Sequence, residues 1–217
     1  IGAVKGGTTS LYRYLGQHPD VFMSSTKAPS FFAYEGHALD FRGPRDQELG
    51  APSFAVTRWD EYRSLFSGRT TQSAIGEASP VYLYHPEAPA RIARRLPGVR
   101  LIAILRDPAE RAFSNYAMFV RDRRETLTFR QAIQACGARQ EANWTHGWQY
   151  VELGFYARQL SRYRALLDQS RLKVLFYEDL ANHPEELMRE VFEFIGVDPT
   201  FRPDLRERHN ASVVKRR

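Results

Sequence analysis

The chain has 217 residues, of which 43% are hydrophobic and 26% charged, so its composition excludes a disordered chain and is typical of one globular α/β domain. Its single cysteine, Cys136, excludes an internal disulfide and a cysteine-based metal cluster, and it favours a reducing, cytoplasmic location. The formal net charge of +6 favours anionic partners, but no basic block interleaved with aromatic residues indicates a nucleic-acid interface.

Short apolar runs alternate with amphipathic stretches along the chain. The apolar runs predict four strands, over residues 1–4, 73–75, 99–105 and 172–176. The amphipathic stretches predict six helices, over residues 9–15, 88–95, 108–123, 129–134, 156–167 and 184–195. This alternation indicates a three-layer α/β domain with a central parallel sheet flanked by helices. The polar segment 135–154, with Trp144 and Trp148, is predicted to be an irregular lid or insertion.

We expect residues 1–217 to form one domain. Residue 1 already lies inside the first predicted strand, so we expect the natural chain to begin earlier. No apolar run in these 217 residues approaches the roughly 20 residues of a membrane-spanning helix, and no signal peptide is visible.

The first predicted strand leads into a turn rich in glycine and hydroxyl residues, IGAVKGGTTSL. A standard phosphate loop has the pattern G-x-x-x-x-G-K-[ST] between a strand and a helix. Gly2 and Gly7 keep that spacing, but the lysine lies at Lys5, and Thr8 occupies its usual place. Backbone N–H groups, a helix N-terminus and hydroxyls all favour an oxyanion here. The alternative is a glycine-rich turn that only begins a helix. The predicted anion-binding residues are Lys5, Gly6, Gly7, Thr8, Thr9 and Ser10.

A second anion site is predicted after the apolar run LIAIL. Asp107 suits a helix N-cap and Pro108 suits the first helical position, so a helix should begin directly after the strand. Ser114 lies about two helical turns beyond Asp107, so Arg106 and Ser114 can face one pocket. An ion pair between Arg106 and Asp107 or Glu110 is the alternative. A magnesium-dependent NTPase would instead require an acid at the end of this strand.

Together the two segments resemble motifs of the PAPS-dependent sulfotransferases, in particular their carbohydrate-type and bacterial branch. KGGTTSL (residues 5–11) is similar to their first motif and RDPAERAFSNY (residues 106–116) to their second. Weaker likeness covers GEASPVYLY, LGFYARQL, VLFYEDL and FIGV, and so extends over most of the chain. The resemblance implies a P-loop-NTPase-like fold, PAPS as co-substrate and no metal. It also implies sulfuryl transfer to a hydroxyl of a small-molecule, carbohydrate or lipid acceptor, with release of adenosine 3′,5′-bisphosphate.

The resemblance also implies roles for individual residues. Lys5 and its loop would hold the 5′-phosphosulfate end, with Lys5 stabilising the leaving oxygen. Arg106 and Ser114 would hold the 3′-phosphate. Lys215 and Arg216 match a region where relatives carry a basic loop that closes over the 3′-phosphate, although a frayed basic tail is the alternative.

The segment expected to face the acceptor departs from the pattern of the family that the chain resembles. Heparan-type members place a catalytic glutamate in a segment like K-E-x-H-F-F, and KAPSFF has Ala28 at that position. Glu77 is the leading replacement as base, because it follows an apolar run at the expected carboxyl end of a parallel strand; a structural carboxylate is the alternative. His37 is a weaker candidate, with a solvated loop histidine as its alternative. Lys27 would border the sulfonate or lie on the surface. A catalytically silent nucleotide-binding homologue and a P-loop kinase or NTPase are the rival functions.

Overall fold

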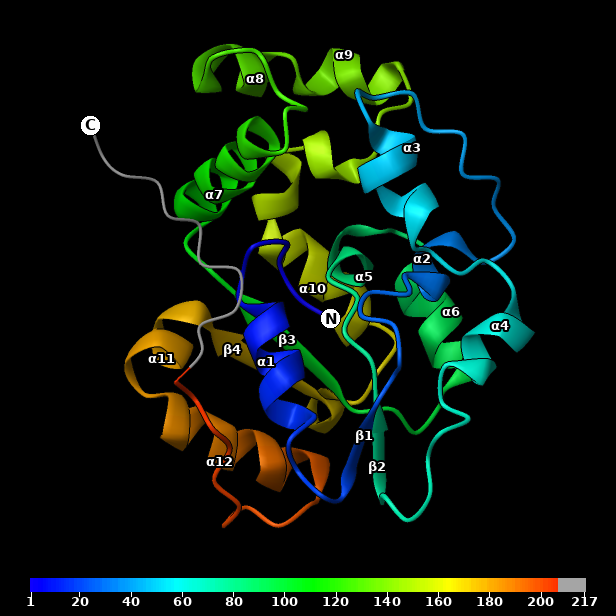
Figure 1. Cartoon of the computed structure of the whole chain (residues 1–217), viewed down its shortest axis with the longest axis vertical. Coiled ribbons are helices and arrows are strands. Elements are labelled where there is room, and N and C mark those ends of the chain that lie inside the picture. Colours follow the sequence, from blue (N-terminus) through cyan, green and yellow to red (C-terminus); the bar gives the residue numbers. More distant parts are fainter. Residues whose placement is uncertain (207–217) are drawn as a thin grey trace.

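A computed structural model describes residues 1–206 of the chain (Figure 1). Two parallel strand pairs form its sheets: β1 (Val21–Met23) with β2 (Ala74–Gly76), and β3 (Leu101–Leu105) with β4 (Leu172–Phe176). Gly2 adds one parallel bridge to Ile104, so the first residues of the chain lie along β3.

Helices surround these strands and make up most of the regular secondary structure of the described chain. The longer helices are α1 (Thr8–Leu15), α6 (Ala88–Arg95), α7 (Pro108–Arg121), α10 (Tyr156–Arg164) and α12 (Pro184–Ile195). The shorter ones are α2 (Phe31–Tyr34), α3 (Asp46–Leu49), α4 (Trp59–Ser64), α5 (Val81–Tyr84), α8 (Phe129–Gln134), α9 (Cys136–Glu141) and α11 (Tyr177–Asn182). Four 3-10 turns complete the list: η1 (Ala51–Ser53), η2 (His146–Trp148), η3 (Glu152–Gly154) and η4 (Gln169–Arg171). No helix within residues 1–206 is both long and apolar enough to cross a membrane.

Strand β3 divides two hydrophobic clusters, because successive side chains of a strand point to opposite faces. Leu101, Ala103 and Leu105 pack with α2, α5, α6 and α10 on one face. Ile104 packs on the other face with α1, α11 and α12, as the arrangement in Figure 1 shows. Both faces of this strand are therefore covered, and the expected three-layer α/β fold is confirmed.

A third hydrophobic cluster lies beside α7, α8 and α9, at the top of Figure 1. It contains Phe119, Trp148 and Tyr150, and the last two are completely buried. The prediction of irregular structure over 135–154 is wrong in part, because α9 and two 3-10 turns occupy much of that segment. Its aromatic side chains fill a core, which fixes the local backbone.

The start of α7 follows its sequence signals. The Glu110 N–H donates to Asp107 Oδ1 over 2.8 Å, and Pro108 is the first helical residue. This N-cap ends the strand-to-helix turn within two residues of β3. The side chains of Arg106 and Ser114 are thereby set at the carboxyl end of β3, where ligands bind in open α/β sheets.

Candidate functional site

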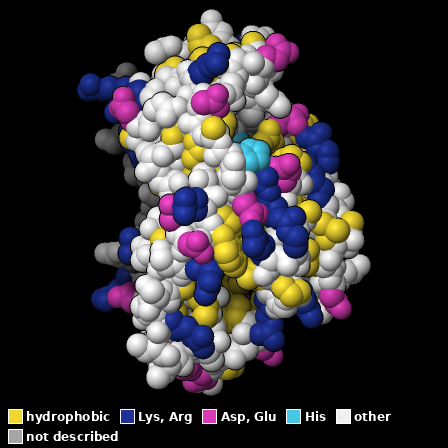
Figure 2. Space-filling model, turned by 90° about the vertical axis from the view of Figure 1, so that its right-hand side faces the viewer, with side chains coloured by type: hydrophobic (Ala, Val, Ile, Leu, Met, Phe, Trp, Pro, Cys, Tyr) yellow, Lys and Arg dark blue, Asp and Glu magenta, His cyan; other side chains and the backbone are white. Residues whose placement is uncertain are grey.

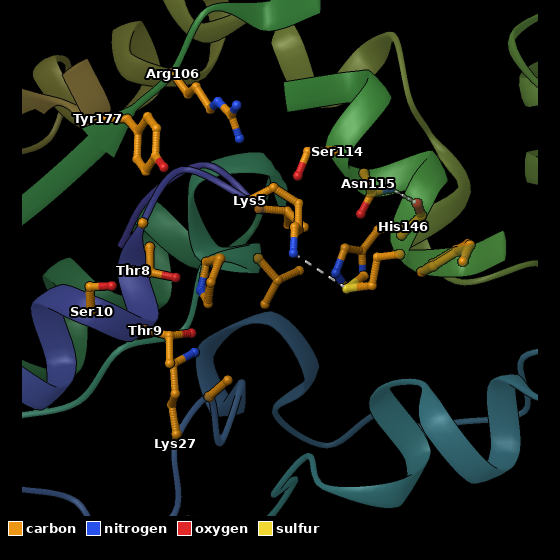
Figure 3. Close-up of a pocket in the computed structure, with 18 of the residues that line it drawn as sticks. Lys5, Thr8, Thr9, Ser10, Lys27, Arg106, Ser114, Asn115, His146 and Tyr177 are labelled. Atoms are coloured by element: carbon orange, nitrogen blue, oxygen red, sulfur yellow. Dashed lines mark hydrogen bonds between the residues drawn. The ribbon is translucent and has the colours of Figure 1, made fainter. Parts of the chain in front are cut away.

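A cavity of about 1190 Å³ lies where the first loop, the start of α7 and the turn η2 meet (Figure 3). Among the described residues its wall contains one carboxylate, Glu110. The same wall carries four cationic side chains, those of Lys5, Lys27, Arg106 and Arg124. This excess of positive charge at the end of β3 suits an anionic ligand.

The first loop is shaped by unusual backbone conformations. Gly7 has φ +94°, and a Cβ there would lie 3.0 Å from side-chain atoms of both Tyr177 and Leu180. Lys5 has φ 66°, a left-handed conformation that side chains other than glycine rarely adopt. The loop thereby brings the N-terminus of α1 and the Lys5 side chain to the cavity, as expected of a phosphate cradle. Thr8, Thr9 and Ser10 line the cavity too, whereas Gly6 packs against the Ile104 carbonyl.

Two lysines face the cavity without an ion-pair partner among residues 1–206. The Lys5 Nζ lies 3.8 Å from the Met118 Sδ, a neutral and weak acceptor. Burial lowers the pKa of Lys5, and the charges of Arg121 and Arg106 lower it further. Burial likewise lowers the pKa of Lys27. A buried cation that lacks a carboxylate is stabilised when an anion binds beside it.

Arg106 and Ser114 lie on the same cavity, as their spacing predicted (Figure 3). The Arg106 guanidinium lies over the Tyr177 ring, 4.6 Å from its centroid, and donates to Glu110 Oε2 over 2.8 Å. The hydroxyl of Tyr156 donates to the Arg106 carbonyl over 2.9 Å. Arg106 therefore both forms the ion pair with Glu110 and lines the cavity. Since the Glu110 side chain is 60% exposed, it is a weak competitor for an incoming phosphate.

Glu77 does not line this cavity. The Ser79 hydroxyl donates to Glu77 Oε2 over 2.7 Å and accepts from the Ser30 N–H over 2.9 Å, and Ser30 lines the cavity. Burial raises the pKa of Glu77, although hydrogen bonds from Tyr82 and Ser79 oppose that rise. Its charge in turn opposes the lowering of the Lys27 pKa. We expected Glu77 to line the same cavity as Lys5. In the structure it lies outside that cavity, and its charge acts on Lys27, which lines it.

Glu77 borders a second hollow instead, of about 720 Å³. Its wall is mostly apolar and includes Trp59, Ile75 and Leu101. Figure 2 shows hydrophobic side chains within a hollow on the face that carries α4 and α6. Glu77 and Lys5 thus line different cavities, although Thr8 lines both.

His37 also lies apart from the first cavity. Its side chain is 46% exposed, and its Nε2 lies 2.9 Å from Arg91 Nη2 and 3.4 Å from Glu87 Oε2. Basic and acidic side chains alternate over this face in Figure 2. The structure thus gives His37 the surroundings of a surface ion cluster. Lys215 and Arg216 lie outside the described residues.

Sequence reasoning missed His146, which lines the first cavity from the turn η2 (Figure 3). Its Nδ1 lies 2.7 Å from the Tyr34 Oη. Burial lowers the pKa of His146 to about 4. The sequence signal was a histidine beside tryptophans in a polar segment, but the neighbouring Trp144 and Trp148 do not line the cavity. Within residues 1–206 no three His, Cys, Asp or Glu side chains gather as a metal site.

The comparisons with known proteins show which family this chain resembles. A model of the sulfotransferase family matches residues 1–202. The chain is 30% identical over 203 residues to heparan sulfate glucosamine 3-O-sulfotransferase 3A1 of Mus musculus, covering 91% of this chain and 44% of that protein. It is 30% identical over 205 residues to bifunctional heparan sulfate N-deacetylase/N-sulfotransferase 1 of Mus musculus, covering 92% and 22%. The chain thus spans less than half the length of these curated relatives.

Solved structures give the same picture of the fold. A sulfotransferase from Alicyclobacillus acidocaldarius is 36% identical, with a TM-score of 0.89 over 95% of this chain and 83% of that chain. A sulfotransferase domain from the curacin biosynthetic pathway is 16% identical, with a TM-score of 0.57 over 94% and 75%, and so shares the fold alone.

Proposed function

Because this chain belongs to the sulfotransferase family, we propose that it transfers the sulfuryl group of PAPS to a hydroxyl group and releases adenosine 3′,5′-bisphosphate. A carbohydrate, a lipid or another natural product is the proposed class of acceptor. Relatives named for heparan sulfate support a carbohydrate within this class. A reducing cytoplasmic compartment is the proposed location, in keeping with a free and buried Cys136.

One observation carries the proposal: a single cavity is lined both by Lys5 in the first loop and by Arg106 at the end of β3. PAPS has a phosphosulfate on one side of its adenosine and a separate phosphate on the other. A cavity with two cationic positions on different elements suits such a ligand better than a single triphosphate chain.

The residues present fit this co-substrate. Lys5, with the loop residues at the start of α1, would hold the 5′-phosphosulfate and stabilise the negative charge on the leaving oxygen. Arg106 and Ser114 would hold the 3′-phosphate, and the planar Arg106 can donate two parallel hydrogen bonds to it. Lys27 would neutralise the sulfonate. The chain's contribution is therefore to orient two reactants and to stabilise the departing charge.

Calorimetry with adenosine 3′,5′-bisphosphate tests this assignment. We expect the wild-type protein to bind this nucleotide, and Arg106→Glu to lose that binding. Arg94→Glu is the matched control, because Arg94 is 65% exposed on α6 and pairs with Glu35 away from the cavity. Unchanged affinity in Arg106→Glu would contradict the assignment, and tighter binding of ATP–Mg²⁺ would favour the kinase or NTPase alternative.

Transfer of labelled sulfate from PAPS to a panel of hydroxyl acceptors tests the reaction itself. The panel should contain heparan-type oligosaccharides, neutral sugars, sterols and phenols. We expect at least one acceptor to be labelled. Nucleotide binding with no transfer to any acceptor, and no hydrolysis of PAPS, would support the catalytically silent alternative.

A further inference from the structure

Among residues 1–206, no carboxylate is positioned in the first cavity to accept a proton from an acceptor hydroxyl. Ala28 lines the cavity at the position where the resembling family carries its glutamate. The one carboxylate in the described wall, Glu110, is engaged with Arg106 and lies over the first turn of α7. The reaction proposed above still needs a proton acceptor, because a neutral hydroxyl is a poor nucleophile.

The turn η2 is held from one side by a buried carboxylate, Asp46. Asp46 accepts from the Thr145 N–H over 2.8 Å, from the Thr145 hydroxyl over 2.9 Å and from the Trp148 Nε1 over 3.0 Å. These three hydrogen bonds fix the residues before and after His146. They leave the imidazole as the side chain that the turn presents to the cavity.

Helix α7 holds the same turn from the other side. The Asn115 Nδ2 donates to the Gly147 carbonyl over 2.6 Å. A Cβ at Gly147 would lie only 2.8 Å from the Phe119 ring, so this residue must be glycine for the turn to pack closely. Support of this kind on both sides is what a catalytic side chain needs to keep one orientation.

The two ring nitrogens of His146 have different surroundings. Nδ1 lies 2.7 Å from the Tyr34 Oη, whereas Nε2 has no hydrogen-bond partner among residues 1–206. His146 and Lys5 border the same cavity, and Figure 3 shows both side chains directed into it. Burial raises the pKa of Tyr34, so that its hydroxyl stays protonated. Burial lowers the pKa of His146, so the imidazole is neutral at neutral pH and one of its two ring nitrogens carries no proton.

The cavity charges select the tautomer of the neutral ring. Lys5, Lys27 and Arg106 make the cavity positive. A lone pair on Nε2 that faces these cations is favoured over an N–H that faces them. The proton then resides on Nδ1, which donates to the Tyr34 oxygen.

We propose that His146 is the catalytic base of this sulfotransferase, a role that rests on the function proposed above. His146 Nε2 takes the proton of the acceptor hydroxyl while that oxygen forms a bond to the sulfur of PAPS. The bond from sulfur to the bridging oxygen breaks, and adenosine 3′,5′-bisphosphate leaves with the electron pair beside Lys5. Tyr34 is a positioning residue that holds the Nδ1–H tautomer. Glu77 then need not reach the acceptor.

The tautomer is directly measurable by ¹⁵N NMR of the imidazole nitrogens in the wild-type protein without ligand, with His146→Gln to assign the signals. We expect an unprotonated Nε2 and a protonated Nδ1 at neutral pH. A protonated Nε2 facing the cavity would overturn the proposal. This measurement does not depend on knowing the acceptor.

Transfer kinetics test the role in turnover. With phenol as acceptor and PAPS as donor, His146→Ala should lower kcat by about 10²–10⁴-fold, the usual contribution of a general base. With 4-nitrophenol, whose hydroxyl is far more acidic, the loss should be less than about tenfold. Equal losses for the two phenols would overturn the proposal, because a merely structural defect lowers both rates alike.

Three comparisons separate this proposal from the proposed function. His85→Ala is the matched control, since His85 also packs on Tyr34, with ring centroids 5.8 Å apart, but does not line the cavity. Tyr34→Phe should lower kcat for phenol by about tenfold while the affinity for adenosine 3′,5′-bisphosphate stays unchanged. His146→Ala should also keep this affinity. If the wild-type protein does not bind the nucleotide, the proposed function fails; if it binds and transfers while His146→Ala retains full activity, only the role of His146 fails.

Discussion

Two neighbouring regions of this molecule hold charged side chains away from solvent, fully in one region and partly in the other, and they balance those charges differently. In the first, which we call the clamp (Asp46, Arg124, Glu125 and Arg139), every member has an opposite partner: Arg124 pairs with Asp46, and Arg139 Nη1 lies 2.6 Å from Glu125 Oε2. In the cavity, Lys5 and Lys27 form no ion pair with a described carboxylate, although the charge of Glu77 acts on Lys27. The two regions meet at the turn η2, which Asp46 holds and His146 presents to the cavity.

The difference separates structural charges from functional ones. A buried ion pair is costly to break, because removal of one partner leaves the other charge uncompensated. A buried cation with no partner already destabilises the empty protein, and only a bound anion offsets that penalty. Substitutions in the clamp should therefore alter stability first, and substitutions in the cavity should alter binding and turnover first.

The largest effect is expected for Asp46→Ala in the clamp. The change leaves Arg124 unpaired and removes the acceptor of the Thr145 and Trp148 hydrogen bonds, so the free energy of unfolding should fall by about 3–5 kcal/mol. Urea denaturation measures this loss. Glu48→Gln, which disrupts an exposed ion pair with Arg45, should change stability by less than about 0.5 kcal/mol. A loss below about 1 kcal/mol in Asp46→Ala would contradict the structural role of the clamp.

Lys5→Met should have the opposite signature. It removes a partly buried cation that has no ion-pair partner among residues 1–206, so the urea midpoint should stay the same or rise, while turnover with PAPS falls by about 10²–10³-fold. Lys173→Met is the paired counterpart, because the Lys173 Nζ lies 3.0 Å from Glu190 Oε2, and it should leave turnover unchanged. Clear destabilisation by Lys5→Met with normal turnover would remove the distinction between the regions.

Arg106→Lys sharpens the comparison within the cavity. The positive charge remains, but the planar group that lies over Tyr177 and can hold a phosphate by two hydrogen bonds is lost. Affinity for adenosine 3′,5′-bisphosphate should fall about tenfold, which corresponds to about 1.4 kcal/mol. Calorimetry measures the change, and Arg94→Lys should bind like the wild type. An affinity equal to that of the wild type would show that charge alone suffices.

The smallest effect concerns the pH dependence of stability, which rises with pH in both regions but over different pH ranges. Burial raises the pKa of Glu125, but hydrogen bonds from Arg139 and from the Leu127 N–H outweigh burial and hold it below 4.5, so stability should fall as pH falls below that value. The pKa of Lys5 in the folded protein lies below its ordinary value of 10.5. Between the folded pKa and 10.5 the unfolded chain binds more protons than the folded one, so stability should rise with pH.

Urea titrations at several pH values test the pH dependence of stability in both the acid and the alkaline range. Lys5→Met should reduce only the rise in stability at alkaline pH. If this variant shows the same alkaline rise as the wild type, the Lys5 ammonium is not the group responsible.

The sequence predicted those helices that are defined by signals within their own residues. Helices α6, α8 and α12 occupy the predicted ranges, because periodic apolar residues and N-terminal prolines or a threonine cap define them. Strand β1 was missed, since Val21–Met23 is only three residues long and becomes a strand by pairing with β2, more than fifty residues later in the chain. The helices α2 to α5 were also missed, because each has only four to six residues and shows no clear periodic pattern.

The site was predictable where a motif specifies it. Lys5, Arg106 and Ser114 were predicted from short patterns, and the structure brings them to one cavity. The position of Glu77 directly after β2 was expected in outline, but the direction of its side chain was not, because the pairing of β2 decides it. His146 could not be found from local sequence, since its setting depends on Tyr34, 112 residues earlier, and on Asp46.

The left-handed backbone of Lys5 has a practical consequence. Glycine adopts φ 66° without the steric penalty that any side chain incurs there, so Lys5→Gly would relieve both backbone strain and an uncompensated buried charge. A laboratory selection for heat resistance would therefore enrich glycine at this position. The survivors would outlast the parent at high temperature and would no longer turn over their donor, so any thermostabilisation campaign on this scaffold should hold position 5 constant.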